Sequence, residues 1–157
     1  MIYLAPPMRR TKLLLIHIAY KLKVCYWFLL RPTTRGAKYV IFYGDQVLLV
    51  RPTYGHKMWM IPGGGVKKRE TFAVGAAREL QEETSITTKL TYFYEYTQVQ
   101  EYKHDTVQCF YGYVTKAEVS IDNFEIVTYG WFSPNNLPVD CSPIVARILN
   151  QYQMTVI

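Results

Sequence analysis

GGVKKRETFAVGAARELQEETSI, residues 64–86, is the stretch that decides the fold and most of the chemistry. Its part from Phe72 to Thr84 predicts a helix, because it holds alanines, Leu80 and several Glu and Gln residues but no proline. Residues three and four apart share a helix face. One face of this helix therefore carries three carboxylates. A neighbouring arc of the helix is expected to pack inward, and it consists of Ala73, Ala77, Leu80 and Thr84.

The three carboxylates belong to Glu79, Glu82 and Glu83, and they repel one another unless a cation neutralises them. Hard divalent ions such as Mg²⁺ prefer oxygen ligands of this kind, together with water and substrate phosphates. An acidic helix face that is merely solvated is the alternative interpretation, and the helix alone leaves both open.

The spacing of the stretch resembles the Nudix box of the Nudix hydrolases. The pattern has Gly, five residues, Glu, seven residues, Arg-Glu-aliphatic, any residue, Glu-Glu, any residue, Gly and an aliphatic residue. One position departs from it, because Ser85 stands where the pattern has Gly. Ser adopts the left-handed turn that ends such a helix less readily than Gly, so the helix end could differ, without loss of a metal ligand. The matching residues are Gly64, Glu70, Arg78, Glu79, Leu80, Glu82, Glu83 and Ile86.

The resemblance assigns roles to these residues. It implies a metal site with the Gly64 carbonyl and the carboxylates of Glu79, Glu82 and Glu83, holding Mg²⁺ or Mn²⁺. It also implies that Glu70 and Arg78 form an ion pair that braces the loop and orients Glu79, which is a supporting role around the ligands. Before the box, three consecutive glycines (63–65) let the backbone approach a ligand, although an ordinary glycine-rich turn would look the same.

The rest of the chain predicts one domain with an N-terminal extension. We expect a hairpin from residues 37–43 and 46–51, a short strand at 59–61, and long strands at 86–99 and 106–115 around a charged turn at 101–105. Another strand is predicted at 126–133, and Ser142-Pro143 predicts the start of a helix that ends near Tyr152. These elements favour an α/β (α+β) fold in which helices sandwich a mixed sheet, as the resemblance also implies. The expected boundaries are 1–36 for the extension and 37–157 for the Nudix hydrolase domain.

Composition places few further limits. The chain has 157 residues, of which half are apolar, and a formal net charge of +6. Lys67, Lys68 and Arg69 lie in the box loop, where they could attract an anionic substrate or simply be solvated. The three cysteines are widely spaced and form no zinc or redox motif, which indicates a reducing compartment and a cytoplasmic location. No specific nucleic-acid binding is expected.

Residues 13–30, LLLIHIAYKLKVCYWFLL, form an apolar segment close to the length of a transmembrane helix. Lys21 and Lys23 in its middle argue against a membrane span, and no cleavage site suggests a signal peptide. As a helix it has two apolar stripes. The first was expected to pack on its own domain, and the second to contact another subunit in a homodimer or a membrane surface. The first comprises Leu15, Ile18, Leu22, Cys25 and Leu29, and the second comprises Leu13, Ile16, Tyr20 and Trp27.

Together, these features predict a metal-dependent hydrolase that cleaves the diphosphate linkage of a nucleoside diphosphate joined to another moiety. Glu79 and Glu83 are candidates for the base or for bridging metal ions, and Glu118 or Glu125 on later segments could supply the base instead. The alternative is a weakly active nucleotide-binding or membrane-associated regulatory module on the same fold. The sequence leaves open which nucleotide derivative is the substrate and how many ions bind.

Overall fold

The computed structural model describes residues 2–4, 10–53, 57–100, 102–121 and 125–156. Its sheet begins with the predicted hairpin, formed by β2 (Thr33–Tyr43) and β3 (Gln46–Pro52). Gly44 makes the turn with φ of +60°, a left-handed conformation that glycine adopts at little cost. β2 starts at Thr33 rather than at residue 37, so the strand is longer than expected.

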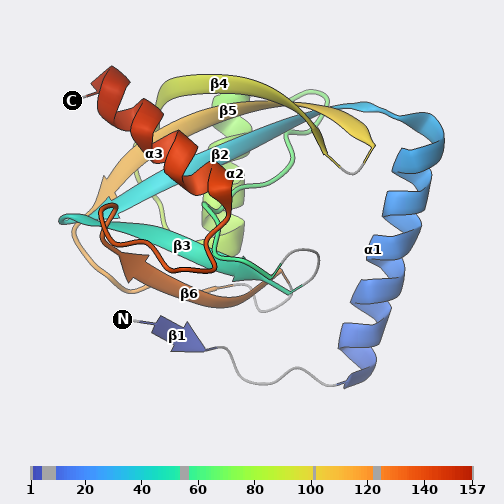
Figure 1. Ribbon diagram of the computed structural model, residues 1–157, viewed down its shortest axis with the longest axis horizontal. Helices are drawn as coiled ribbons and strands as arrows, with labels where there is room; N and C mark the ends of the chain where they lie inside the picture. The colour runs from blue at the N-terminus through green and yellow to red at the C-terminus, as the bar shows by residue number, and fades with distance from the viewer. Residues whose placement is uncertain (1, 5–9, 54–56, 101, 122–124, 157) are drawn as a thin grey trace.

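The sheet has six strands in the order β1-β6-β3-β2-β5-β4 (Figure 1). The pair β2–β5 is parallel and the other neighbouring pairs are antiparallel, so the sheet is mixed as predicted. The outer strands are β1 (Ile2–Leu4) at one edge and β4 (Thr91–Gln100) at the other. Between them lie β5 (Lys103–Val114) and β6 (Ile126–Phe132).

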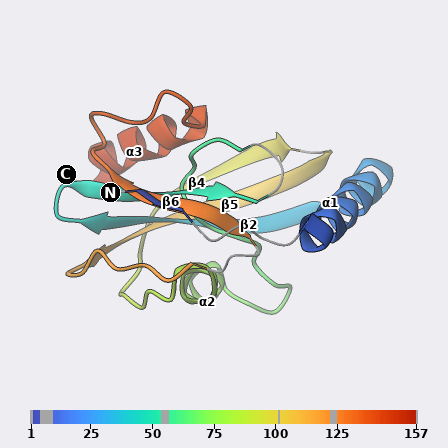
Figure 2. The ribbon, with the colours of Figure 1, turned by 90° about the horizontal axis from the view of Figure 1, so that it is seen from below.

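Two helices cover the two faces of this sheet (Figure 2). The helix α2 (Phe72–Thr84) lies on one face and α3 (Pro143–Val156) on the other. The core under α3 includes Val40, Leu49 and Ile148, and the core under α2 includes Tyr39, Ile41 and Leu80. The predicted α+β sandwich is therefore confirmed. Many aromatic side chains of the strands help to fill the two cores, one on each face of the sheet.

Several other predicted elements or boundaries were wrong. Residues 59–61 form no strand and make only isolated bridges, Val50 with Met60 and Trp59 with Cys141. Residues 86–90 are irregular, and β4 begins at Thr91. The helix α3 starts at Pro143 as expected but continues to Val156. Of the predicted turn at 101–105, residues 103–105 belong instead to β5, and residue 101 lies outside the described residues.

The N-terminal segment forms a long helix, α1 (Arg10–Leu30), which stands beside the body near the β4–β5 turn (Figures 1 and 2). Its orientation is opposite to our prediction. The stripe that we expected to pack on the domain is exposed, with Leu15, Leu22 and Leu29 between 66% and 71% accessible. Trp27, from the other stripe, is buried at 9%. The side chains of Leu13 and Ile16 lie outside the described ones.

The Trp27 side of α1 faces the body because of aromatic and cationic contacts with residues that only the fold brings together. The Trp27 ring lies under the ammonium groups of Lys23 and Lys103, at 5.1 and 4.6 Å from the ring centroid. Phe28 makes an edge-to-face contact with Tyr102 at 5.0 Å. Cation–π and aromatic contacts of this kind favour Trp over Leu at the docking position.

Candidate active site

The helix α2 carries most of the candidate residues, and its ends are well defined. Thr71 caps its start, where the hydroxyl accepts a hydrogen bond from the Val74 N–H at 3.2 Å. Ser85 ends it in the left-handed conformation with φ of 56°, and its N–H donates to the Gln81 carbonyl. Serine therefore adopts the turn that glycine usually provides. The replacement of Gly by Ser85 therefore does not alter how the helix ends.

The face of α2 that turns inward differs from our prediction. Leu80 and Thr84 are buried as expected, but Ala73 and Ala77 are exposed. Glu83 is buried instead, at 7% accessibility, beside the sheet. The inward face is made of Gly75, Ala76, Leu80, Glu83 and Thr84. A carboxylate on this face needs polar partners from the sheet, because burying an unpaired charge is costly.

Tyr39 on β2 supplies that partner, since its hydroxyl donates a hydrogen bond to Glu83 Oε2. Burial raises the pKa of Glu83 to about 7, although the Tyr39 bond and the nearby Lys38 ammonium act in the opposite direction. Burial also raises the pKa of Tyr39, and the charge of Glu83 adds to this effect. Burial thus favours the neutral form of the Glu83 carboxyl more than it would at an exposed site.

Arg78 is the centre of a second group of contacts. Its guanidinium binds Glu70 through two bonds, Nε to Oε1 at 2.8 Å and Nη2 to Oε2 at 2.9 Å. Its Nη1 atom donates to Glu79 at 2.7 Å and to Glu82 at 2.9 Å, and Nη2 also donates to the Gly65 carbonyl at 3.0 Å. The Arg78 bond holds the pKa of Glu70 at about 2. The expected Glu70–Arg78 pair forms, and Arg78 also orients two of the three helix carboxylates.

The glycine-rich segment lies directly against this group. A Cβ atom at Gly64 would collide with the Glu79 carboxylate, whereas one at Gly65 would meet open space. The Gly64 carbonyl accepts a hydrogen bond from the Ala37 N–H at 3.0 Å, which ties the segment to β2. A side chain at position 64 would therefore displace the Glu79 carboxylate, and the two candidate ligand groups are neighbours.

This donor set fits a hard divalent cation. It offers carboxylate oxygens and a backbone carbonyl, which retains a second lone pair after the Ala37 bond. Within the described residues, no three His, Cys, Asp or Glu side chains already converge on one point. Glu79 and Glu82 turn to Arg78, and Glu83 turns to Tyr39. A cation would therefore compete with Arg78 and Tyr39 for these oxygens.

The remaining predicted residues are less closely grouped. Glu125 is exposed, and its charge is near enough to add to the raised pKa of Glu83. Glu118 is exposed on an irregular segment after β5. In the box loop, Lys68 and Arg69 line a cavity, whereas Lys67 holds Glu70 through its backbone N–H at 3.0 Å.

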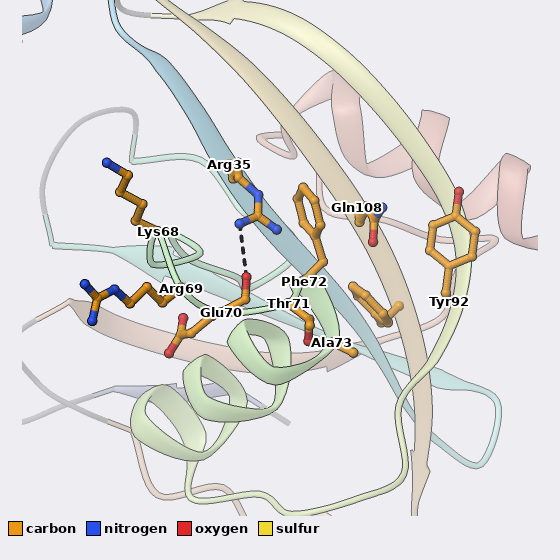
Figure 3. A pocket seen from close by; sticks show the side chains of 10 residues that line it. Arg35, Lys68, Arg69, Glu70, Thr71, Phe72, Ala73, Tyr92 and Gln108 are labelled. Atoms are coloured by element: carbon orange, nitrogen blue, oxygen red, sulfur yellow. Dashed lines mark hydrogen bonds between the residues drawn. The ribbon is translucent and has the colours of Figure 1, made fainter.

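That cavity measures about 530 Å³ and lies at the start of α2 (Figure 3). Arg35 on β2 reaches it, donating to the Glu70 carbonyl at 3.0 Å and stacking on the Phe72 ring at 4.3 Å. Tyr92 and Phe110 form an aromatic wall across from these side chains. Arg35 and Ala37 are consecutive residues on one face of β2, roughly 7 Å apart. Because Ala37 binds the Gly64 carbonyl, the cavity lies two residues along β2 from the segment that contacts Glu79.

Sequence reasoning did not find Tyr39, Lys38 or Arg35. All three lie on β2, and the sequence signal there was only that of an apolar strand. Lys38 is the one position that could have been noticed, because a lysine interrupts the apolar run. Its ammonium donates to the Ile61 carbonyl at 2.9 Å, and burial lowers its pKa.

Comparison with known proteins identifies the family of this chain. The family model described as NUDIX domain matches residues 32–152. The chain belongs to the Nudix family. The expected enzyme class, a Nudix pyrophosphohydrolase, is thereby confirmed. Members of this family generally use divalent metal ions.

Two curated relatives and one solved structure illustrate the similarity. The Bacillus subtilis (strain 168) protein named "Putative 8-oxo-dGTP diphosphatase" is 28% identical over 76% of this chain and 80% of its own length. Diphosphoinositol polyphosphate phosphohydrolase 2 of Rattus norvegicus is 35% identical over 52% of this chain, a match that spans 43% of that protein. The MutT NUDIX hydrolase of Burkholderia pseudomallei shares the fold with a TM-score of 0.69, at 20% identity over 76% of this chain and 97% of that one.

Two further observations concern the surroundings of this Nudix enzyme. All three cysteines are free. Among the helices of the described segments, none is both long and apolar enough to cross a membrane.

Proposed function

We propose that this Nudix enzyme hydrolyses the diphosphate linkage of a nucleoside diphosphate joined to another moiety, with Mg²⁺ or Mn²⁺ as cofactor. The observation that carries the proposal is the contact between Gly64 and Glu79 next to Glu82 and Glu83. These four residues would hold the cation. Bound there, it would neutralise charge on the phosphate oxygens and lower the pKa of the attacking water.

The chain's own residues divide the remaining work. Arg78, held by Glu70, fixes the direction of Glu79 and Glu82. Burial raises the pKa of Glu83 to about 7, and a cation bound beside it would favour the ionised form that serves as a ligand. Tyr39 keeps the Glu83 carboxyl in place. The free cysteines support a reducing, cytoplasmic location.

The cavity beside the carboxylates would receive the rest of the substrate. Arg35, Lys68 and Arg69 supply positive charge for phosphate oxygens, and Tyr92 and Phe110 supply aromatic surface for a base. The names of the two relatives refer to a nucleoside triphosphate and a diphosphoinositol polyphosphate. Both are rich in phosphate, which agrees with a cationic cavity.

The test is phosphate or nucleotide release from a panel of nucleoside triphosphates, dinucleoside polyphosphates, nucleotide sugars, ADP-ribose and diphosphoinositol phosphates. Turnover should vanish with excess chelator and return with Mg²⁺ or Mn²⁺. Glu82→Gln should lower kcat on the order of 10²-fold or more, because it removes a charged ligand. Asp45→Asn, which neutralises an exposed carboxylate in the β2–β3 turn, is the matched control. Undiminished turnover in chelator would contradict the metal mechanism.

The cavity is tested separately by the pair Lys68→Gln and Arg69→Gln. This double variant should raise KM more than it lowers kcat, because it weakens attraction to the substrate before and during reaction alike. Lys89→Gln with Lys116→Gln removes the same charge from exposed positions outside the cavity. Equal effects of the two double variants would show that only net charge matters.

A further inference from the structure

The side of α1 that points away from the body is an apolar surface without a partner in the described chain. We define it as the outer face of α1. Its aliphatic and tyrosine side chains are between 47% and 71% exposed, and Cys25 lies among them. The outer face comprises Leu14, Leu15, Ile18, Leu22, Cys25, Tyr26 and Leu29.

The rotation of α1 follows from its contacts with the body. Trp27 is buried against Lys103, and this contact marks the inner side of the helix. At 100° per residue, the outer face covers an arc of roughly 120° centred opposite Trp27. No charged residue falls within this arc. Lys21 lies at one margin of it, as in helices that lie flat in a lipid surface while their lysines reach the headgroups. The ammonium group of Lys23 turns inward, onto the Trp27 ring.

The distribution of charge supports the same partner. Residues 1–44 contain eight Lys and Arg residues and no Asp or Glu, since Asp45 is the first acidic residue. Residues 45–157 contain ten basic and twelve acidic residues. Arg35 and Lys38 belong to the body, but α1 itself contains four basic residues, Arg10, Lys12, Lys21 and Lys23, and no acidic one. Such a segment is attracted to an anionic surface, and by roughly 1 kcal/mol for each nearby Lys or Arg.

A second copy of the chain fits this face less well. Two outer faces in contact would bring Lys21 of each copy to the same interface, and α1 has no acidic residue to compensate it. A membrane span is excluded by Lys21 and Lys23 in the middle of the helix. We propose that the outer face of α1 binds the surface of a membrane that contains anionic lipids. This proposal goes beyond the hydrolase function and does not depend on it.

Sedimentation of the full chain with lipid vesicles tests the proposal. The protein should sediment with vesicles of phosphatidylcholine and phosphatidylserine, much less with phosphatidylcholine alone, and added salt should release it. Lys21→Gln should weaken binding about 5-fold, because one charge near the surface is lost. Lys89→Gln has the same net charge and should bind as the wild type. Equal binding to both vesicle types, or equal losses in both variants, would overturn the anionic-lipid assignment.

The apolar part is tested by Ile18→Glu with Leu22→Glu, which should abolish sedimentation while the thermal unfolding midpoint is retained. Val99→Glu with Met154→Glu changes two equally exposed apolar side chains elsewhere and should leave binding intact. An environment-sensitive fluorophore on Cys25, in a Cys141→Ser background, should shift to the blue when vesicles are added. An unchanged spectrum would overturn the proposal. So would a dimer in light scattering without lipid that Ile18→Glu with Leu22→Glu converts to monomer, because the outer face would then be a subunit contact.

Discussion

The helices α2 and α1 differ in how many of their side chains find partners elsewhere in the chain. In the 13-residue α2, the side chains that matter reach partners on other elements, such as Glu83 with Tyr39 and Arg78 with Glu70. In the 21-residue α1, contact with the body is concentrated at Trp27 and Phe28, and the outer face remains exposed. The Glu70–Arg78 contact lies within one motif and can be interpreted from the sequence. The partners of Glu83 and Trp27 lie elsewhere in the chain, so these contacts cannot be interpreted in that way.

The largest expected effect concerns the closest approach in the α2 region. Gly64→Ala should lower kcat/KM by about 10²–10³-fold, because the new methyl group would displace the Glu79 carboxylate. Gly65→Ala is the matched control, since a Cβ there meets nothing within 4 Å. Steady-state kinetics with the best panel substrate gives both values. If the two alanine variants are equally active, the Gly64–Glu79 contact has no role in catalysis.

The Arg78 contacts should be the next most sensitive. Glu70→Gln and Arg78→Gln should each lower kcat by about 10–100-fold, with the larger loss for Arg78→Gln, because it also releases Glu79 and Glu82. The double variant should be no worse than Arg78→Gln alone, since both changes break one interaction. A double-mutant cycle on kcat measures this. Losses that simply multiply would mean that Glu70 acts independently of Arg78.

For α1, the comparison is between its inner and outer sides. Trp27→Ala should lower the free energy of unfolding by about 2 kcal/mol, because it removes a buried ring and two cation–π contacts. Leu22→Ala, at a position 67% exposed, should change it by less than about 0.5 kcal/mol. Urea denaturation measures both. A larger loss for Leu22→Ala than for Trp27→Ala would show that the Leu22 side of the helix, and not the Trp27 side, faces the body.

The smallest expected effect is at the end of α2. Ser85→Gly should raise the free energy of unfolding by about 0.5 kcal/mol, because glycine adopts a φ of 56° without the strain of a Cβ atom, although it gains freedom in the unfolded chain. Thermal and urea unfolding should both show the gain, and kcat should not change. Destabilisation by this change would indicate that the serine side chain has a structural role.

Several features could be predicted because they depend on nearby residues. The bounds of α2, the Glu70–Arg78 pair and the β2–β3 hairpin all follow from short-range spacing. Other features could not. The short apolar segment at 59–61 and the first five residues of the strand predicted at 86–99 do not join the sheet, because a strand needs a neighbour with free hydrogen-bonding groups along its whole length, and these segments have none in the described sheet.

The sequence by itself determined the family and the placement of Glu79, Glu82 and Glu83 on one helix, because a 3.6-residue period and a fixed motif are local properties. Only the tertiary structure decided that Glu83 is buried on Tyr39, that Arg35 reaches the cavity, and that Trp27 rather than Leu22 faces the body. Each of these outcomes depends on residues far apart in the chain. Their contacts exist only after the sheet has brought the segments together, so no local pattern encodes them.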